Sequence, residues 1–77
     1  MPNFNRARSL YIAQMLATEI RTGRKVKGAR TMMQAANDLM GGSKHRTKHA
    51  ALSALVAEMT GTFGYVPTVA VRRAVKA

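Results

Sequence analysis

The chain contains no cysteine and no tryptophan, and aromatic residues make up only 5% of it. Without cysteine there are no disulfides and no thiolate ligands, so a structural zinc site is not expected. Few aromatics argue against a surface that stacks the bases of single strands. The sequence shows no signal-peptide pattern and no run long enough to span a bilayer. We therefore expect a cytoplasmic protein that does not contact membranes.

Acidic residues are nearly as rare. Three Asp and Glu stand against thirteen Lys and Arg, which leaves a formal net charge of +10 over 77 residues. A small domain with this charge repels itself unless a polyanion neutralises it. Nucleic acid is the leading candidate partner, with DNA favoured over RNA, and an acidic protein surface is the alternative.

The scarcity of acids also argues against catalysis. Glu19, Asp38 and Glu58 are far apart in the sequence, and no serine has the Gly-x-Ser-x-Gly setting of a nucleophile elbow. We expect neither an enzyme nor a bound cofactor. His45 and His49 are four residues apart and would share one face of a helix, which is a metal-ligand spacing. No third ligand is evident and the neighbours are basic, so we predict no metal site.

Apolar residues recur at helical spacing along most of the chain. The length allows one domain only. We therefore predict that residues 1–77 form a compact all-α bundle with three main helices and a short C-terminal helix. The expected helices are Arg6–Thr22, capped by Asn3 or Asn5 and ended by Gly23; Ala29–Met40, ended by Gly41 and Gly42; Lys44–Thr60, capped by Ser43; and Pro67–Lys76, with Val71 and Val75 facing inward.

The first candidate binding site is the start of the third predicted helix. Positive side chains in its first turn oppose the helix dipole, an arrangement that makes sense if an anion binds there. The candidate residues are Ser43, Lys44, His45, Arg46, Thr47 and Lys48. A helix, a Gly-Gly-Ser break and a second helix with a basic start are also compatible with a helix-turn-helix-like arrangement.

The second candidate site is the loop between Gly23 and Gly28 with its flanks. Glycines at both ends would let its backbone lie close to a charged partner, and its basic side chains could follow phosphates. The candidate residues are Arg24, Lys25, Lys27 and Arg30.

Two functional hypotheses follow. The first is a nucleic-acid-binding protein that contacts duplex DNA mainly through phosphates, as in a phage protein acting on transcription or genome organisation. About six phosphate contacts would lower its affinity roughly a thousandfold between 50 and 200 mM salt. The second is a protein-binding module or inhibitor that docks on an acidic surface of a nucleic-acid-processing machine, or a structural subunit of a ribosome or virion. A homodimer is compatible with either hypothesis.

Overall fold

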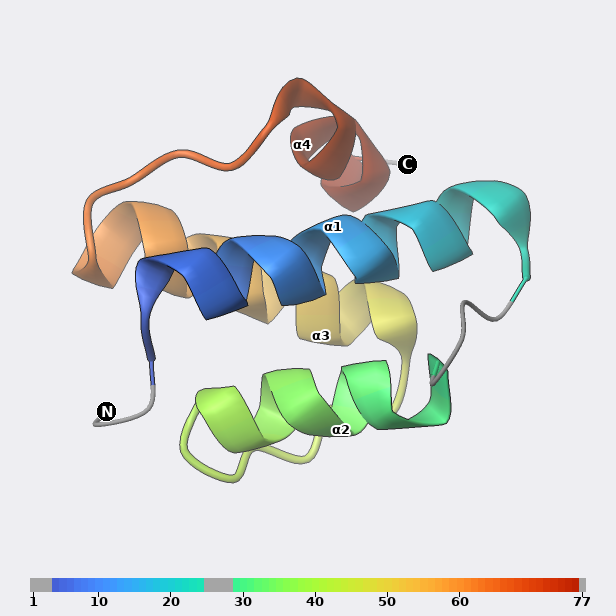
Figure 1. The fold of residues 1–77 in the computed structure, drawn as a ribbon, viewed down its shortest axis with the longest axis horizontal. Helices are drawn as coiled ribbons and strands as arrows, with labels where there is room; N and C mark the ends of the chain where they lie inside the picture. Colours follow the sequence, from blue (N-terminus) through green and yellow to red (C-terminus); the bar gives the residue numbers. More distant parts are fainter. Residues whose placement is uncertain (1–3, 25–28, 77) are drawn as a thin grey trace.

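Helices account for most of the computed structural model, which describes residues 4–24 and 29–76. The elements in chain order are α1 (Arg6–Thr22), α2 (Ala29–Leu39), α3 (Lys48–Ala57), the π-helical turn η1 (Glu58–Thr62) and α4 (Val69–Lys76). No strand occurs in these two ranges, which confirms the all-α prediction. Helix α1 packs against α2, α3 and α4 (Figure 1).

Helix α1 has the predicted bounds. The Asn5 side chain accepts a hydrogen bond from the Arg8 N–H at 2.7 Å, so Asn5 is the N-cap. Gly23 ends the helix with a left-handed φ of 69°, a conformation that costs other residues more than it costs glycine. Ile12 and Leu16 are buried, as the apolar stripe predicts.

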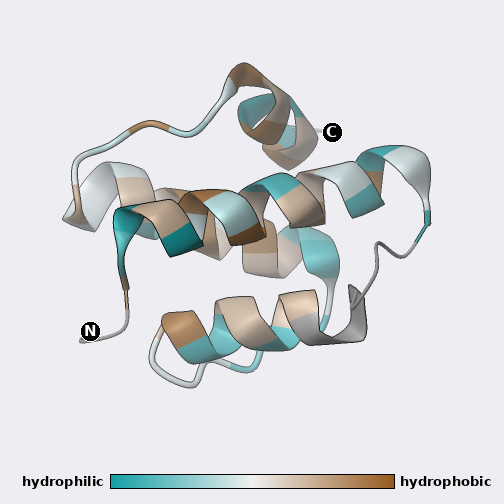
Figure 2. Cartoon of the chain, viewed as in Figure 1, coloured by the Kyte–Doolittle hydropathy of each residue, from teal (hydrophilic) through white to brown (hydrophobic). Residues whose placement is uncertain are grey.

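The core forms where the four helices meet, and each helix carries hydrophobic as well as hydrophilic segments (Figure 2). Its buried hydrophobic members are Phe4, Ile12, Ala13, Leu16, Ala17, Ala36, Leu39, Met40, Ala51, Leu52, Leu55, Met59, Val71 and Ala74. Met32 and Met33 pack against this cluster while half-buried. Core packing therefore accounts for the methionine-rich face of α2.

The connection between α2 and α3 differs from a helix-turn-helix. That motif joins two helices at a steep angle through a turn of about 3–4 residues. Here residues 40–47 separate the helices, and this segment runs back along α2 before α3 begins. As a result α2 and α3 run in the same direction, opposite to α1 (Figure 1). The helix-turn-helix-like arrangement that the sequence allowed is not found between α2 and α3, because the connecting segment is long and extended.

The segment after α3 is attached to the start of α1. The Phe63 ring stacks on Phe4 with centroids 4.3 Å apart, and the Tyr65 hydroxyl hydrogen-bonds Ser9 Oγ. The Arg6 guanidinium lies 5.4 Å from the centre of the Tyr65 ring. These contacts fix the path of the chain across the bundle to α4.

Helix α4 starts two residues later than predicted. Thr68 caps it: its hydroxyl accepts from the Val71 N–H at 3.4 Å, so Pro67 precedes the helix. Val71 is buried and Val75 half-buried, which confirms the predicted inward face. None of the helices in the described ranges is long and apolar enough to cross a bilayer.

Candidate nucleic-acid interface

Helix α3 begins at Lys48 rather than at Lys44. Its N-cap is Thr47, which has an extended backbone and whose Oγ1 accepts from the Ala50 N–H at 3.0 Å. The predicted cap, Ser43, instead donates its hydroxyl to the carbonyl oxygen of Met40 at 3.2 Å. The predicted helix start is therefore wrong, and Lys44 precedes the helix instead of opposing its dipole.

Asn37, near the end of α2, holds this connecting segment in place. Its Nδ2 donates to the carbonyl oxygen of His45 at 3.1 Å, and its Oδ1 accepts from the His45 N–H at 3.2 Å. Its own carbonyl accepts from the N–H groups of Gly42 and Ser43. The sequence held a signal for this role, because asparagine disfavours helix interiors and readily bonds nearby backbone.

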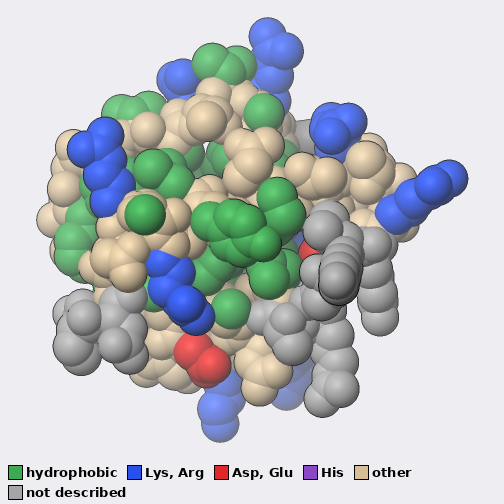
Figure 3. All heavy atoms as spheres, viewed as in Figure 1, with side chains coloured by type: hydrophobic (Ala, Val, Ile, Leu, Met, Phe, Trp, Pro, Cys, Tyr) green, Lys and Arg blue, Asp and Glu red, His purple; other side chains and the backbone are tan. Residues whose placement is uncertain are grey.

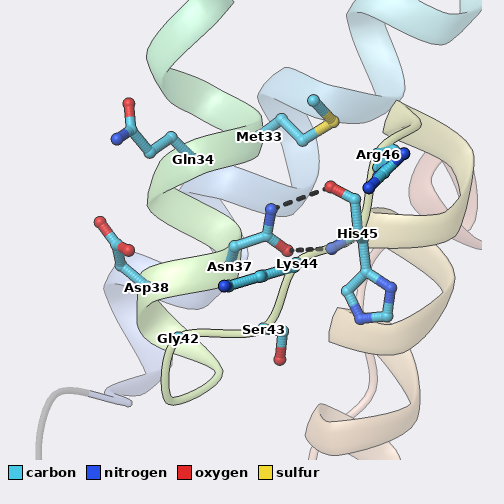
Figure 4. Close-up of a pocket in the computed structure, with 9 residues that line it drawn as sticks. All are labelled: Met33, Gln34, Asn37, Asp38, Gly42, Ser43, Lys44, His45 and Arg46. Carbon is cyan, nitrogen blue, oxygen red and sulfur yellow. Dashed lines mark hydrogen bonds between the residues drawn. The ribbon is translucent and has the colours of Figure 1, made fainter.

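The segment forms one wall of a shallow groove of about 550 Å³ against α2. Figure 4 shows that its polar side chains diverge. Lys44 extends toward α2 on the side of Asp38, the His45 ring turns to the opposite side, and Arg46 lies beside the start of α3. Ser43 lies at the bend below them. The groove therefore does not gather the predicted basic residues around one anion.

Lys48 is also unavailable as a free cation. Its Nζ lies 3.1 Å from Oε1 of Glu19, whose side chain is fully buried, whereas the Lys48 side chain is 34% exposed. Apart from this ion pair, neither carboxylate oxygen of Glu19 has a partner in the described structure. The charge of Lys48 is thus compensated by α1, and we remove this residue from the set of candidate phosphate contacts.

The two histidines lie in different elements. His45 belongs to the connecting segment, whereas His49 is in the first turn of α3. The Nε2 of His49 lies 2.6 Å from the carbonyl oxygen of Val75 and donates to it. The prediction that these histidines share one helix face is wrong, and His49 instead joins α3 to the end of α4.

The second predicted cluster is only partly described. Arg24 is exposed, directly after the end of α1. Lys25 and Lys27 lie outside the described residues. Arg30 is part of α2, but its side chain also lies outside what the structure describes.

Contacts between distant parts of the chain bring other basic residues to one end of the molecule. The Lys48–Glu19 ion pair places the start of α3 beside the last turns of α1, and His49 places it beside the end of α4. Figure 1 shows these three helix ends in the same half of the molecule along its longest axis. We use the name basic end for five exposed Arg and Lys residues at or near these helix ends: Arg21, Arg24, Arg46, Arg73 and Lys76.

No exposed acid accompanies the basic end. The chain has three acids, and the structure describes all of them. Glu19 is buried and paired, Asp38 lies in the last turn of α2, and Glu58 follows α3. The last two positions belong to the opposite end of the bundle (Figure 1). On the face drawn in Figure 3, Lys and Arg side chains project from several parts of the surface, and hydrophobic side chains gather in the middle and on the upper left.

The structure thus brings together basic residues that the sequence placed in separate segments. Arg21 and Arg73 lie far apart in the chain, yet both line one hollow between α1 and α4. Lys76 follows Val75, whose carbonyl binds His49. Comparison with known protein families, curated proteins and solved structures gives no match for this chain, so its geometry and charge carry the functional argument.

Proposed function

We propose that this protein binds double-stranded nucleic acid, with DNA favoured, by placing its basic end against the phosphates. The observation that carries the proposal is the gathering of five exposed Arg and Lys residues where no acid is exposed. A duplex presents about one negative charge per 1.7 Å of its axis, so several phosphates can meet such a surface together.

The dimensions of the molecule favour contact with the backbone over reading of bases. The bundle measures 30 × 24 × 19 Å, and α1, α2 and α3 run along its longest axis (Figure 1). Seen along the longest axis, the bundle is 24 × 19 Å, so its end is wider than the major groove, which is about 12 Å across. The basic end therefore rests on phosphates at the rim of a groove, and binding is largely independent of sequence.

The nature of the basic side chains fits this mode. Four of the five residues of the basic end are arginines, whose planar guanidinium groups bind phosphate oxygens in pairs. The exposed aromatics Tyr11 and Phe63 lie in the first half of α1 and after η1, away from the basic end. Stacking on the bases of a single strand thus has no platform there.

A salt titration of binding to a short DNA duplex tests the proposal. If the five residues neutralise five phosphates, affinity falls about 500-fold between 50 and 200 mM salt. Arg24→Gln/Arg46→Gln is expected to lower the slope of log affinity against log salt by about 1.8. The matched control, Arg8→Gln/Lys44→Gln, removes the same charge from exposed positions outside the basic end.

Parallel titrations with an RNA duplex and a single strand compare the nucleic-acid classes, and circular dichroism checks that each variant is folded. Binding that does not respond to salt would contradict the proposal. Equal changes of slope in the two double variants would also contradict it, because net charge rather than the basic end would then govern binding.

A further inference from the structure

A hollow of about 430 Å³ lies between the last turns of α1 and helix α4. Its lining residues are Ile20, Arg21, Ala70, Arg73 and Ala74. Ala70 and Ala74 are one helical turn apart on α4, so a smooth strip of small side chains runs along one wall. The volume is at the low end for ligand sites, which suits a few side chains of a docking segment better than a whole cofactor.

The chemistry of the hollow combines an apolar floor with two cations. Ile20, Ala70 and Ala74 offer no polar side-chain group, whereas Arg21 and Arg73 are exposed, one on each of the two helices. None of the three acids of the chain lies among the lining residues, and Glu19, the nearest in sequence, faces the core and pairs with Lys48. Both guanidinium groups therefore remain available to an external carboxylate.

A nucleic acid has no group that would contact the apolar floor and the two arginines together. The bases of a duplex are stacked inside it and cannot reach an apolar floor, although its phosphates could meet the two arginines. An unpaired base would need an aromatic ring to stack on, or polar groups that read its edges. The lining offers neither, apart from the arginines themselves.

We propose that this hollow is a docking site for an acidic, amphipathic helical segment of a partner protein. One or two large apolar side chains of the segment enter between α1 and α4, and its carboxylates pair with Arg21 and Arg73. The small side chains of Ala70 and Ala74 let the partner helix approach closely, as in other helix-in-groove complexes. This site goes beyond the proposed duplex binding, which needs only the positive charge of the basic end.

The test uses a short synthetic helical peptide rich in Glu with two Leu residues one turn apart. Its matched control carries Ser in place of both Leu residues. Binding is measured by fluorescence anisotropy at an ionic strength of about 0.15 M, where long-range attraction is screened. We expect the Leu peptide to bind about tenfold more tightly, since it buries apolar surface that the Ser peptide lacks.

Two protein variants test whether the peptide binds in the hollow and at its two arginines. Ala70→Trp fills the hollow from an exposed position and is expected to abolish the preference for the Leu peptide. Arg21→Gln/Arg73→Gln is expected to weaken both peptides at least tenfold, and Arg8→Gln/Lys44→Gln, with the same net charge, much less. Equal affinity for the two peptides, or a preference that survives Ala70→Trp, would overturn the proposal. Neither result bears on duplex binding, which is judged from the slope of log affinity for the duplex against log salt.

Discussion

Glu19 shows how one buried charge can organise a highly basic molecule. It is one of only three acids, and its carboxylate is fully buried on α1 with Lys48 as its charged partner. Removing a carboxylate from water is costly unless a cation compensates it. The pair therefore fixes the first residue of α3 against α1, and it contributes to the alignment of helix ends that forms the basic end.

The two partners of this pair are expected to respond unequally to mutation. Lys48→Ala leaves the Glu19 carboxylate buried without a counter-charge, and we expect a loss of about 3 kcal/mol in the free energy of unfolding. Glu19→Met puts an apolar side chain of similar size in the core and lets the partly exposed Lys48 turn to water. We expect that change to stay within about 1 kcal/mol. Urea denaturation measures both.

Lys44→Ala serves as the control, because Lys44 is exposed and forms no ion pair in the described structure. Its effect is expected to be below about 0.5 kcal/mol. If Glu19→Met cost as much as Lys48→Ala, the attraction within the pair rather than the isolated carboxylate would determine stability, contrary to our account.

At the scale of elements, the segment between α2 and α3 decides where α3 begins. Ser43 and Thr47 are both suitable N-cap residues, and each is followed by helix-compatible sequence. The two hydrogen bonds between Asn37 and the His45 backbone hold the intervening residues extended along α2. The cap therefore falls on Thr47, and Arg46 comes to lie next to the helix start.

Asn37→Ala is expected to release this segment. Both hydrogen bonds to His45 are lost, and we expect the free energy of unfolding to fall by about 1–2 kcal/mol. Hydrogen exchange of the His45 amide should become faster by more than the loss of global stability explains. Gln34→Ala is the matched control, because Gln34 lines the same groove on α2 and is exposed. Unchanged protection of the His45 amide in Asn37→Ala would show that other contacts hold the segment.

At the scale of the whole molecule, the charge is both large and unevenly distributed. The net charge is +10, and the Lys48–Glu19 pair is the one ion pair seen in the described ranges. Most positive charges thus repel one another without local compensation, which destabilises the folded state. Binding a polyanion at the basic end would relieve part of this repulsion.

Stability is accordingly expected to rise with salt. Raising the ionic strength from about 0.01 to 0.15 M shortens the screening length from about 30 to 8 Å. We expect a gain of about 1 kcal/mol, which corresponds to roughly 4–8 °C in the midpoint of thermal unfolding for a domain of this size. Thermal melts followed by circular dichroism measure this. The double variant Arg8→Gln/Lys44→Gln should gain less, and a midpoint that falls or stays constant would refute the expectation.

The sequence by itself determined the class of fold and the existence of the helices. Apolar spacing, a cap at Asn3 or Asn5 and a stop at Gly23 predicted the bounds of α1, because caps and helical periodicity are local properties of the chain. The inward face of α4 followed from the same kind of pattern. The excess of positive charge was equally evident, since it depends on composition alone.

Only the tertiary structure decided which charges lie together. Lys44, Arg46 and Lys48 are close in sequence, but their side chains diverge. Lys44 extends toward α2, whereas Lys48 pairs with the buried carboxylate of Glu19. Arg21 and Arg73 are distant in sequence, yet they line one hollow because α4 packs on α1. Local patterns specify where helices form, whereas long-range packing and one buried ion pair determine which side chains share a surface.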